Sequence, residues 1–342
     1  MRDVARQAGV HPMTVSRALR GHPSIPALTR DRIRKLAAKM GYEVDPLMRA
    51  LMTQIRAGRE FVHQGAIAFL VPSLELAEKS YGYQKLIKGA APRAGQLGYR
   101  LDVIPLNEIG SGRMRLSRLL AARGIHGILI PPLVEVPAGQ IEWSNFTAVA
   151  VGDRRGTPSL HLVRNHHSQT ILLALERLRE LGYRRIGFYL LKLIDDAIRH
   201  TWAALWLYDQ SQRPLKARIP ALMVERLEQG PFLEWLRAYR PEVVLTKHLE
   251  VRSWLEAAGF AIPAKIGFVH LDCIAEFGDC TGVDQNTESA GAAALDLVVE
   301  LLYRNERGVP TQPKTILIDS RWTPGASVRN LTRRTRRASR IQ

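Results

Sequence analysis

The sequence predicts an α/β protein with a small all-α domain at its N-terminus and a larger two-lobed body behind it. Three observations carry this prediction. The first 19 residues have the apolar spacing of a helix-turn-helix. From residue 65 onward, short β-rich runs alternate with amphipathic helical stretches. A chain of 342 residues is also long for one domain and suits a small head on a larger body.

The N-terminal segment MRDVARQAGVHPMTVSRAL carries the helix-turn-helix pattern. Ala5 is small enough for two helices to touch, and Gly9 falls at the turn, where a residue tolerant of positive φ is needed. Val15 is expected on the inner face of the second helix. The polar residues of that helix then face outward, where a recognition helix meets the major groove of DNA: Thr14, Ser16 and Arg17.

The formal charge of +17 is concentrated at the two ends of the chain. Residues 1–60 hold 12 Lys/Arg and 5 Asp/Glu, and residues 321–342 hold 7 Arg and no acid. The residues between them are nearly neutral. A basic head on a neutral body favours a nucleic-acid partner for the head, whereas a generally basic protein would not show this clustering.

Other classes of function find little support in the sequence. No apolar run approaches the length of a membrane span and no signal peptide is visible, so we expect a cytoplasmic protein with no membrane partner. Cys273 and Cys280 lack the spacing of a redox or zinc site, which favours free thiols over a disulfide. No P-loop, HExxH or nucleophile elbow is found, and the histidines of HLVRNHHSQ (161–169) suit a polar surface. We therefore predict no enzyme, no catalytic residue, no metal and no cofactor.

The body alternates strand and helix patterns from GAIAFLV (65–71) to TILIDS (315–320). Such succession predicts parallel sheets with right-handed crossovers. Three helical stretches end in LGY, LGY or AGF before the next strand. The glycines of these phrases suit the left-handed position after a helix: Gly98, Gly182 and Gly259.

The motifs resemble those of the lactose-repressor (LacI) family of bacterial transcription regulators. The likeness rests on DVARQAGV, TVSRAL, TRDRIRKLAAKMGY and DPLMRAL (45–51), the last close to the family's hinge-helix pattern, with Met48-Arg49 where Ala-Arg is usual. It extends, weakly in the middle, to about residue 328. The family's headpiece starts a few residues earlier than Met1.

The resemblance implies a helix-turn-helix headpiece over residues 1–44, a hinge helix over 45–60 and a periplasmic-binding-protein-like body of parallel sheets over 61–328. Lobe 1 is expected at about 61–157 and 284–318, and lobe 2 at about 158–283. The basic residues 329–342 are expected to form a disordered tail, which either adds non-specific DNA affinity or is simply solvated.

The resemblance also assigns DNA contacts. Pro12 and Met13 stand at the leading positions of the recognition helix, where they offer apolar contact to thymine methyl groups. Arg17 is the main candidate for reading guanine, with a phosphate clamp as the alternative. His11 stands where a Ser or Thr cap is usual, so it either caps poorly or touches the backbone. The residues expected on phosphates are Thr14, Ser16, Arg20, Thr29 and Tyr42.

Residues 45–56 are expected to become helical only on operator DNA, beside the same segment of a second subunit. Leu51 of each chain would then wedge into the minor groove at the dyad. The alternative is a plain amphipathic linker packed on the body. Two headpieces on one palindromic operator require a homodimer, and the tail lacks the leucine heptads of a tetramerisation helix.

Ligands of open parallel sheets bind beyond the carboxyl ends of strands, which directs attention to Ser73, Asp153, Lys247, His248 and Asp272. By resemblance, Asp153, Asp272 and Gln285 are sugar-contacting positions, and Trp202 or Trp206 would supply a flat apolar face. The alternative is that these polar groups only satisfy the backbone of turns.

The chain departs from the family at two such positions. Thr201, next to His200, stands where an arginine is usual, and Lys247-His248 replaces Asn-Asp. Either the effector differs from common sugars, with Lys247, Arg199 and His248 suiting an acidic compound, or control by an inducer is lost.

These observations together predict a dimeric regulator, a repressor rather than an activator, that binds double-stranded operator DNA and a small sugar-like effector. The alternative is a non-specific DNA-binding protein with a degenerate effector pocket.

Overall fold

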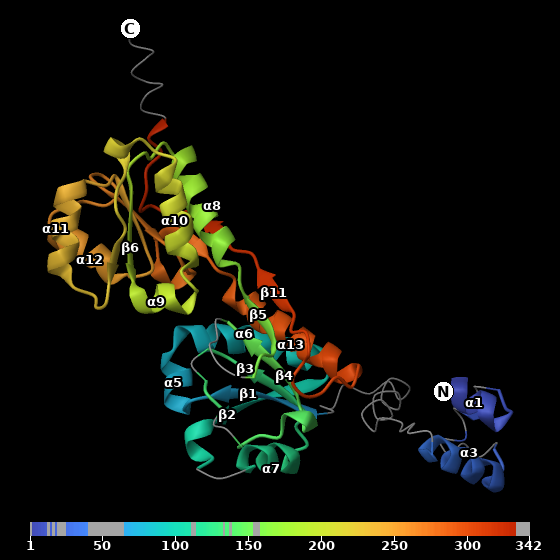
Figure 1. The fold of residues 1–342 in the computed structure, drawn as a ribbon. Helices are drawn as coiled ribbons and strands as arrows, with labels where there is room; N and C mark the ends of the chain where they lie inside the picture. The colour runs from blue at the N-terminus through green and yellow to red at the C-terminus, as the bar shows by residue number, and fades with distance from the viewer. Residues whose placement is uncertain are drawn as a thin grey trace. The chain divides into compact units, whose positions relative to one another are not determined.

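The computed structural model divides the chain into two compact units, residues 1–64 and 65–342 (Figure 1). It describes residues 2–11, 14, 15, 18, 25–39, 65–110, 114–132, 134–136, 139–152 and 158–332. None of the helices within these ranges is long and apolar enough to cross a membrane.

The first unit contains α1 (Arg2–Ala8) and α3 (Ala27–Lys39). Gly9 ends α1 with a φ of 65°, which confirms the predicted turn. Ala5 and Val15 are buried together with Ala18, Ile33 and Ala37, so the expected apolar lining forms a small core. Arg32 of α3 donates a hydrogen bond to the carbonyl of Ala8 at 3.1 Å, which ties the two helices at the end of α1.

The first lobe of the second unit is built on a six-stranded sheet in the order β11-β5-β4-β3-β1-β2. Every neighbouring pair is parallel. The strands are β1 (Gly65–Val71), β2 (Tyr99–Pro105), β3 (Gly127–Ile130), β4 (Thr147–Val151), β5 (His161–Asn165) and β11 (Thr315–Ile318).

Helices cover both faces of this sheet because successive side chains of each strand point to opposite sides. Ile67 and Phe69 of β1 pack with α5 (Leu74–Lys79), α6 (Tyr81–Gln96) and α13 (Thr287–Tyr303). Ala68 and Leu70 pack on the other face, against α7 (Arg115–Ala122). Two short 3-10 helices complete the lobe, η1 (Leu106–Glu108) and η2 (Trp143–Asn145).

The second lobe has its own six-stranded sheet in the order β12-β10-β9-β8-β6-β7, parallel except for β12 against β10. Its strands are β6 (Ile186–Leu191), β7 (Leu222–Val224), β8 (Val243–Thr246), β9 (Gly267–His270), β10 (Thr281–Asp284) and β12 (Arg321–Thr323).

Helices α8 (His167–Glu180) and α10 (Thr201–Ser211) pack on one face of this second sheet, and α11 (Gln229–Tyr239) and α12 (Glu250–Ala257) on the other (Figure 1). The short helix α9 (Lys192–Ala197) follows β6. The 3-10 helices are η3 (Leu215–Ala217) and η4 (Ala275–Phe277).

The predicted two-lobed parallel architecture is confirmed, but one lobe boundary is wrong. β5 pairs with β4 and β11, so the first lobe extends to Asn165 instead of ending at residue 157. The boundary was misplaced because β5 still belongs to the first sheet, and the chain enters the second lobe only after this strand. The three predicted glycine caps are confirmed by positive φ angles of 79°, 92° and 77° at Gly98, Gly182 and Gly259.

Candidate ligand-binding site

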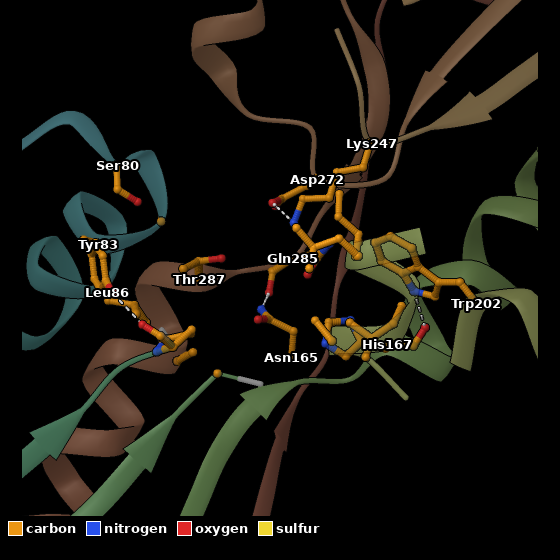
Figure 2. Close-up of a pocket in the computed structure, with 18 residues that line it drawn as sticks. Ser80, Tyr83, Leu86, Asn165, His167, Trp202, Lys247, Asp272, Gln285 and Thr287 are labelled. Atoms are coloured by element: carbon orange, nitrogen blue, oxygen red, sulfur yellow. Dashed lines mark hydrogen bonds and ion pairs between the residues drawn. The ribbon is translucent and has the colours of Figure 1, made fainter. Parts of the chain in front are cut away.

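A cavity of about 380 Å³ lies where the two lobes meet (Figure 2). Its lining includes residues at or just after the carboxyl ends of six parallel strands, three from each sheet. These residues are Pro132, Gly152, Asn165, Lys247, Asp272 and Gln285. The cavity therefore occupies the place where open parallel sheets bind their ligands.

Most of the remaining cavity wall is apolar. One side comes from α9 and the start of α10, through Leu193, Ile194, Ile198 and Trp202. The indole Nε1 of Trp202 donates a hydrogen bond to the carbonyl of His167 at 3.1 Å, which fixes the ring in place. The facing side, from the first lobe, comes from Tyr83, Leu86, Pro132 and Ala290.

Two side-chain amides at the base of the cavity donate hydrogen bonds to backbone carbonyls of the protein. Asn165 donates its Nδ2 hydrogen to the carbonyl of Gln285 at 2.5 Å, and Gln285 donates its Nε2 hydrogen to the carbonyl of Leu271 at 2.7 Å. The first bond joins two segments that pass between the lobes, β5 to α8 and β10 to α13 (Figure 2). The second bond ties the β10–α13 segment to the second lobe. A third segment runs between the lobes from β11 to β12 and contains Asp319. Asn286 donates a hydrogen bond to the backbone carbonyl of Asp319 at 2.6 Å, and the ring of His166 bonds to its carboxylate at 2.7 Å. These side chains tie together the segments that connect the two lobes.

Lys247 and Asp272 are the charged residues of the cavity lining. The ammonium Nζ of Lys247 lies 3.0 Å from Oδ2 of Asp272. The two side chains keep 33% and 19% of their surface exposed. Because each charge offsets the other, the lining as a whole is close to neutral.

Three helices begin at the cavity without a side-chain cap. The residues preceding α6, α8 and α13 are Ser80, His166 and Asn286, and none of these side chains bonds to the helix start. Ser80, His167 and Thr287 line the cavity. The backbone N–H groups at a helix start attract oxygen acceptors, so this side of the cavity suits ligand hydroxyl or carbonyl oxygens.

A further set of contacts joins the lobes beside the cavity. Lys85 of α6 pairs with Glu288 of the same lobe at 2.8 Å and reaches Glu276 of the other lobe at 3.6 Å. Tyr81 meets Phe277 of η4 with 6.4 Å between ring centroids. The pKa of Lys85 is raised, chiefly by its hydrogen bond to Glu288, so this cation stays charged.

Four of the predicted effector residues line the cavity: Trp202, Lys247, Asp272 and Gln285. Asp153 lies outside the described residues. The other three serve the protein locally. Ser73 caps α5 by accepting a hydrogen bond from the backbone of Leu76, Thr201 donates to the carbonyl of Ile198, and His248 accepts from the N–H of Leu191.

The alternative candidates also lie elsewhere. Trp206 stacks on Phe188 in the core of the second lobe. Arg199 lines a separate hollow, and His200 bonds to Asp195 at 2.9 Å. Of the three basic residues that suited an acidic compound, Lys247 alone faces the cavity.

Sequence reasoning missed the apolar wall and the helix starts. Residues in this group are Ser80, Tyr83, Leu86, Asn165, Leu193, Ile194, Ile198 and Thr287. The sequence held a signal for part of this wall, because Leu193 and Ile194 lie two and three residues after the end of β6. Extending the strand-end rule by one helical turn would have found them.

Because the ring of His248 is buried, we expect the free energy of unfolding to depend markedly on pH. Burial lowers its pKa from 6.5 to about 4, and its ring nitrogen accepts a hydrogen bond that needs the neutral form. Between pH 6.5 and 4 the unfolded chain binds the extra proton, so stability falls as the pH falls, by up to about 3 kcal/mol. Denaturant unfolding of the native chain and His248→Gln at pH 7 and 4.5 checks this. The variant should show a flatter pH dependence, and parallel curves would contradict the assignment.

The described part of the N-terminal unit holds three predicted DNA-binding residues. His11 is exposed, while Thr14 and Thr29 are partly buried. The backbone N–H of Thr14 bonds to the carbonyl of His11 at 2.8 Å, where the second helix starts. The other predicted contacts lie outside the described residues: Pro12, Met13, Ser16, Arg17, Arg20, Tyr42 and Leu51.

Comparison with family models gives two matches. Residues 1–45 match the model of bacterial regulatory proteins of the lacI family. Residues 175–328 match the model of the periplasmic binding protein-like domain.

Two curated proteins are similar over parts of the chain. The HTH-type transcriptional regulator GntR of Pseudomonas aeruginosa is 39% identical over 74 residues, which cover 22% of this chain and 19% of that protein. Catabolite control protein A of Priestia megaterium is 20% identical over 188 residues, which cover 54% of this chain and 53% of that protein. The chain therefore matches about a fifth of the first relative and about half of the second.

Solved structures share the fold along most of the chain. The cellobiose complex of the transcriptional regulator CelR has a TM-score of 0.55 at 18% identity, covering 95% of this chain and 98% of that one. The lac repressor dimer bound to operator has a TM-score of 0.54 at 19% identity, covering 95% and 97%. A ribose-bound regulator from Enterococcus faecium has a TM-score of 0.55 at 16% identity, covering 78% and 99%.

Proposed function

Because the chain belongs to the lacI family of bacterial regulatory proteins, we propose that it is a transcription regulator that binds specific DNA sequences under the control of a small effector. The observation that carries the proposal is the lacI-family match of residues 1–45 on the same chain as a two-lobed body with an interlobe cavity. The first part suits DNA, and the second suits a ligand of small-molecule size.

The proposal includes a homodimer that represses transcription from a palindromic operator, in the cytoplasm. Support comes from the lac repressor, which shares this fold and is a dimer on its operator. Two identical heads related by a two-fold axis require a DNA site with the same symmetry.

Control by the effector follows from the position of the cavity. A ligand between the lobes changes the equilibrium between open and closed forms only through its different affinity for the two. Closure of the lobes would change the contacts that Lys85 and Tyr81 make with the second lobe. It would also change the hydrogen bond between Asn165 and Gln285, which joins two segments that connect the lobes. We propose that closure alters the two hinge segments of the dimer and so the affinity for the operator.

The effector predicted from the sequence is sugar-like, and two solved relatives hold cellobiose and ribose. In this chain Asp272 would accept hydrogen bonds from ligand hydroxyl groups, Lys247 would donate to ligand oxygens, and Trp202 would supply an apolar face. The apolar make-up of the remaining wall favours an effector that is less polar than a free sugar.

The proposal is tested by selecting genomic DNA fragments with the purified full chain at about physiological salt. The variants are Arg17→Ala and Leu51→Ala, with Arg226→Ala, an exposed residue of the second lobe, as the matched control. We expect one palindromic motif from the native chain and the control, its loss with Arg17→Ala, and about tenfold weaker binding with Leu51→Ala.

Broad binding shared by all four proteins would reject sequence-specific recognition. It would instead support the alternative, a non-specific DNA-binding protein, for which the basic charge of residues 1–60 and 321–342 is sufficient.

A further inference from the structure

We infer that the effector is an uncharged amphipathic molecule, with a compact apolar ring or branched body and one hydroxyl-type head. The inference rests on the proposed function and specifies the ligand class of the same cavity. The body lies against α9 and α10, and the head meets the Lys247–Asp272 pair.

The apolar body is indicated by the wall opposite the first lobe. This side of the cavity is lined by Leu193 and Ile194 of α9, by Ile198 directly after that helix, and by Trp202 of α10. Leu193 is 74% exposed although it is a large apolar side chain. A ligand that covers it removes this surface from water, at about 25 cal/mol per Å² buried.

The apolar part of the lining disfavours a free sugar, because polar partners are confined to the helix starts, Asn165, Gln285 and the Lys247–Asp272 pair. A sugar has hydroxyl groups around its whole rim, and each one that is buried without a partner costs about 1–3 kcal/mol. Leu86, Ile194, Ile198 and Ala290 offer no such partner. The Nδ2 of Asn165 and the Nε2 of Gln285 donate to backbone carbonyls, and the indole Nε1 of Trp202 does the same.

The electrostatics of the lining indicate a neutral head. Lys247 is within 3.0 Å of Asp272, so an acidic ligand that approached the ammonium would also approach a carboxylate. A cationic amine that approached the carboxylate of Asp272 would likewise approach the ammonium of Lys247. A hydroxyl group instead donates to Asp272 while it accepts from Lys247, which keeps the pair intact. His248 adds no positive charge, since burial lowers its pKa to about 4 and keeps it neutral near pH 7.

The test is calorimetric titration of the full chain at pH 7.5, without DNA, using three probes. 4-Ethylphenol is neutral at this pH, 4-ethylbenzoate has the same body with a charged head, and D-glucose represents sugars. We expect 4-ethylphenol to bind at least about tenfold more tightly than either of the others. Tighter binding of glucose, tighter binding of 4-ethylbenzoate, or no binding of 4-ethylphenol up to 10 mM would each overturn the inference.

Three variants locate the probes in the cavity, and each has a defined outcome. Leu193→Asn should weaken 4-ethylphenol about fivefold. Leu207→Asn makes the same exchange at another exposed leucine, outside the cavity lining, and should leave the affinity unchanged. Asp272→Asn should strengthen 4-ethylbenzoate about tenfold by releasing Lys247. Equal effects of the two leucine variants, or no gain with Asp272→Asn, would contradict the placement.

These measurements are independent of DNA recognition. If the probes fail while the palindromic motif is found, the ligand class is wrong and the regulator stands. If the probes bind but no motif is found, the cavity assignment stands and sequence-specific regulation is rejected.

Discussion

Replacing Gly89 by alanine is expected to destabilise the first lobe by about 4 kcal/mol or more, a loss typical of severe core clashes. Gly89 lies where α6 crosses α13, and an added Cβ would fall 2.6 Å from the carbonyl carbon of Glu288, with the carbonyl oxygen closer still. Backbone atoms cannot rotate away as a flexible side chain can, so the helices must separate.

Gly291 on α13 makes the reciprocal approach. A Cβ there would lie 2.9 Å from the carbonyl carbon of Leu86, again with the oxygen closer. Gly291→Ala should therefore cause a loss of similar size. The two helices approach each other at glycines from both sides, which brings their backbones close enough for α13 to cover the sheet beside α6.

Denaturant unfolding of each variant measures these losses. Gly95→Ala is the matched control, because it lies in the same helix α6 and an added Cβ would meet nothing within 4 Å. It should be neutral or stabilising by up to about 1 kcal/mol, since alanine favours a helix over glycine. A Gly89→Ala chain as stable as the Gly95→Ala chain would contradict the close approach of the two helices.

Removing the indole of Trp202 should cost about 3–5 kcal/mol and also disrupt ligand binding. Trp202 is fully buried, packs edge-on to His167 with 5.7 Å between centroids and forms part of the cavity wall. Trp202→Ala leaves a void that opens onto the cavity, so a ligand loses its apolar support. Trp202→Phe should keep most of the stability because the ring packing is partly retained.

Trp206→Ala separates the two effects. Trp206 lies in the same helix and is fully buried, but it stacks on Phe188 at 5.3 Å and does not line the cavity. It should lose stability comparably while the folded protein retains its affinity for 4-ethylphenol. Unfolding and calorimetric titration of both alanine variants provide the comparison. Equal loss of affinity would show that Trp202 acts only through stability.

Local patterns in the sequence were sufficient to predict the architecture. Ala5, Gly9 and Val15 mark a helical hairpin because their spacing places small and apolar side chains on one side. The alternation of apolar runs with helical stretches predicted parallel sheets, while the chain length and the family resemblance indicated two lobes. It did not assign β5 to its lobe, because strand neighbours depend on pairing between distant segments.

The candidate site was predicted only in part, for a related reason. Lys247 and Asp272 were found because carboxyl ends of parallel strands converge. Ser73 and His248 satisfy the same rule but bond to nearby backbone groups instead. A strand-end position therefore indicates where a side chain starts, and its neighbours determine whether it faces a ligand.

The sequence by itself determined the helix-turn-helix head, the succession of strands and helices, and the edge of each sheet where polar residues collect. Tertiary structure alone decided that Lys247 pairs with Asp272 and that α9 places Leu193 and Ile194 at the cavity. It also decided that the amides of Asn165 and Gln285 donate to backbone carbonyls where the lobes are connected. The reason is physical: periodicity and turn chemistry act over a few residues, whereas the cavity forms where the two lobes meet and side chains from distant segments compete for partners.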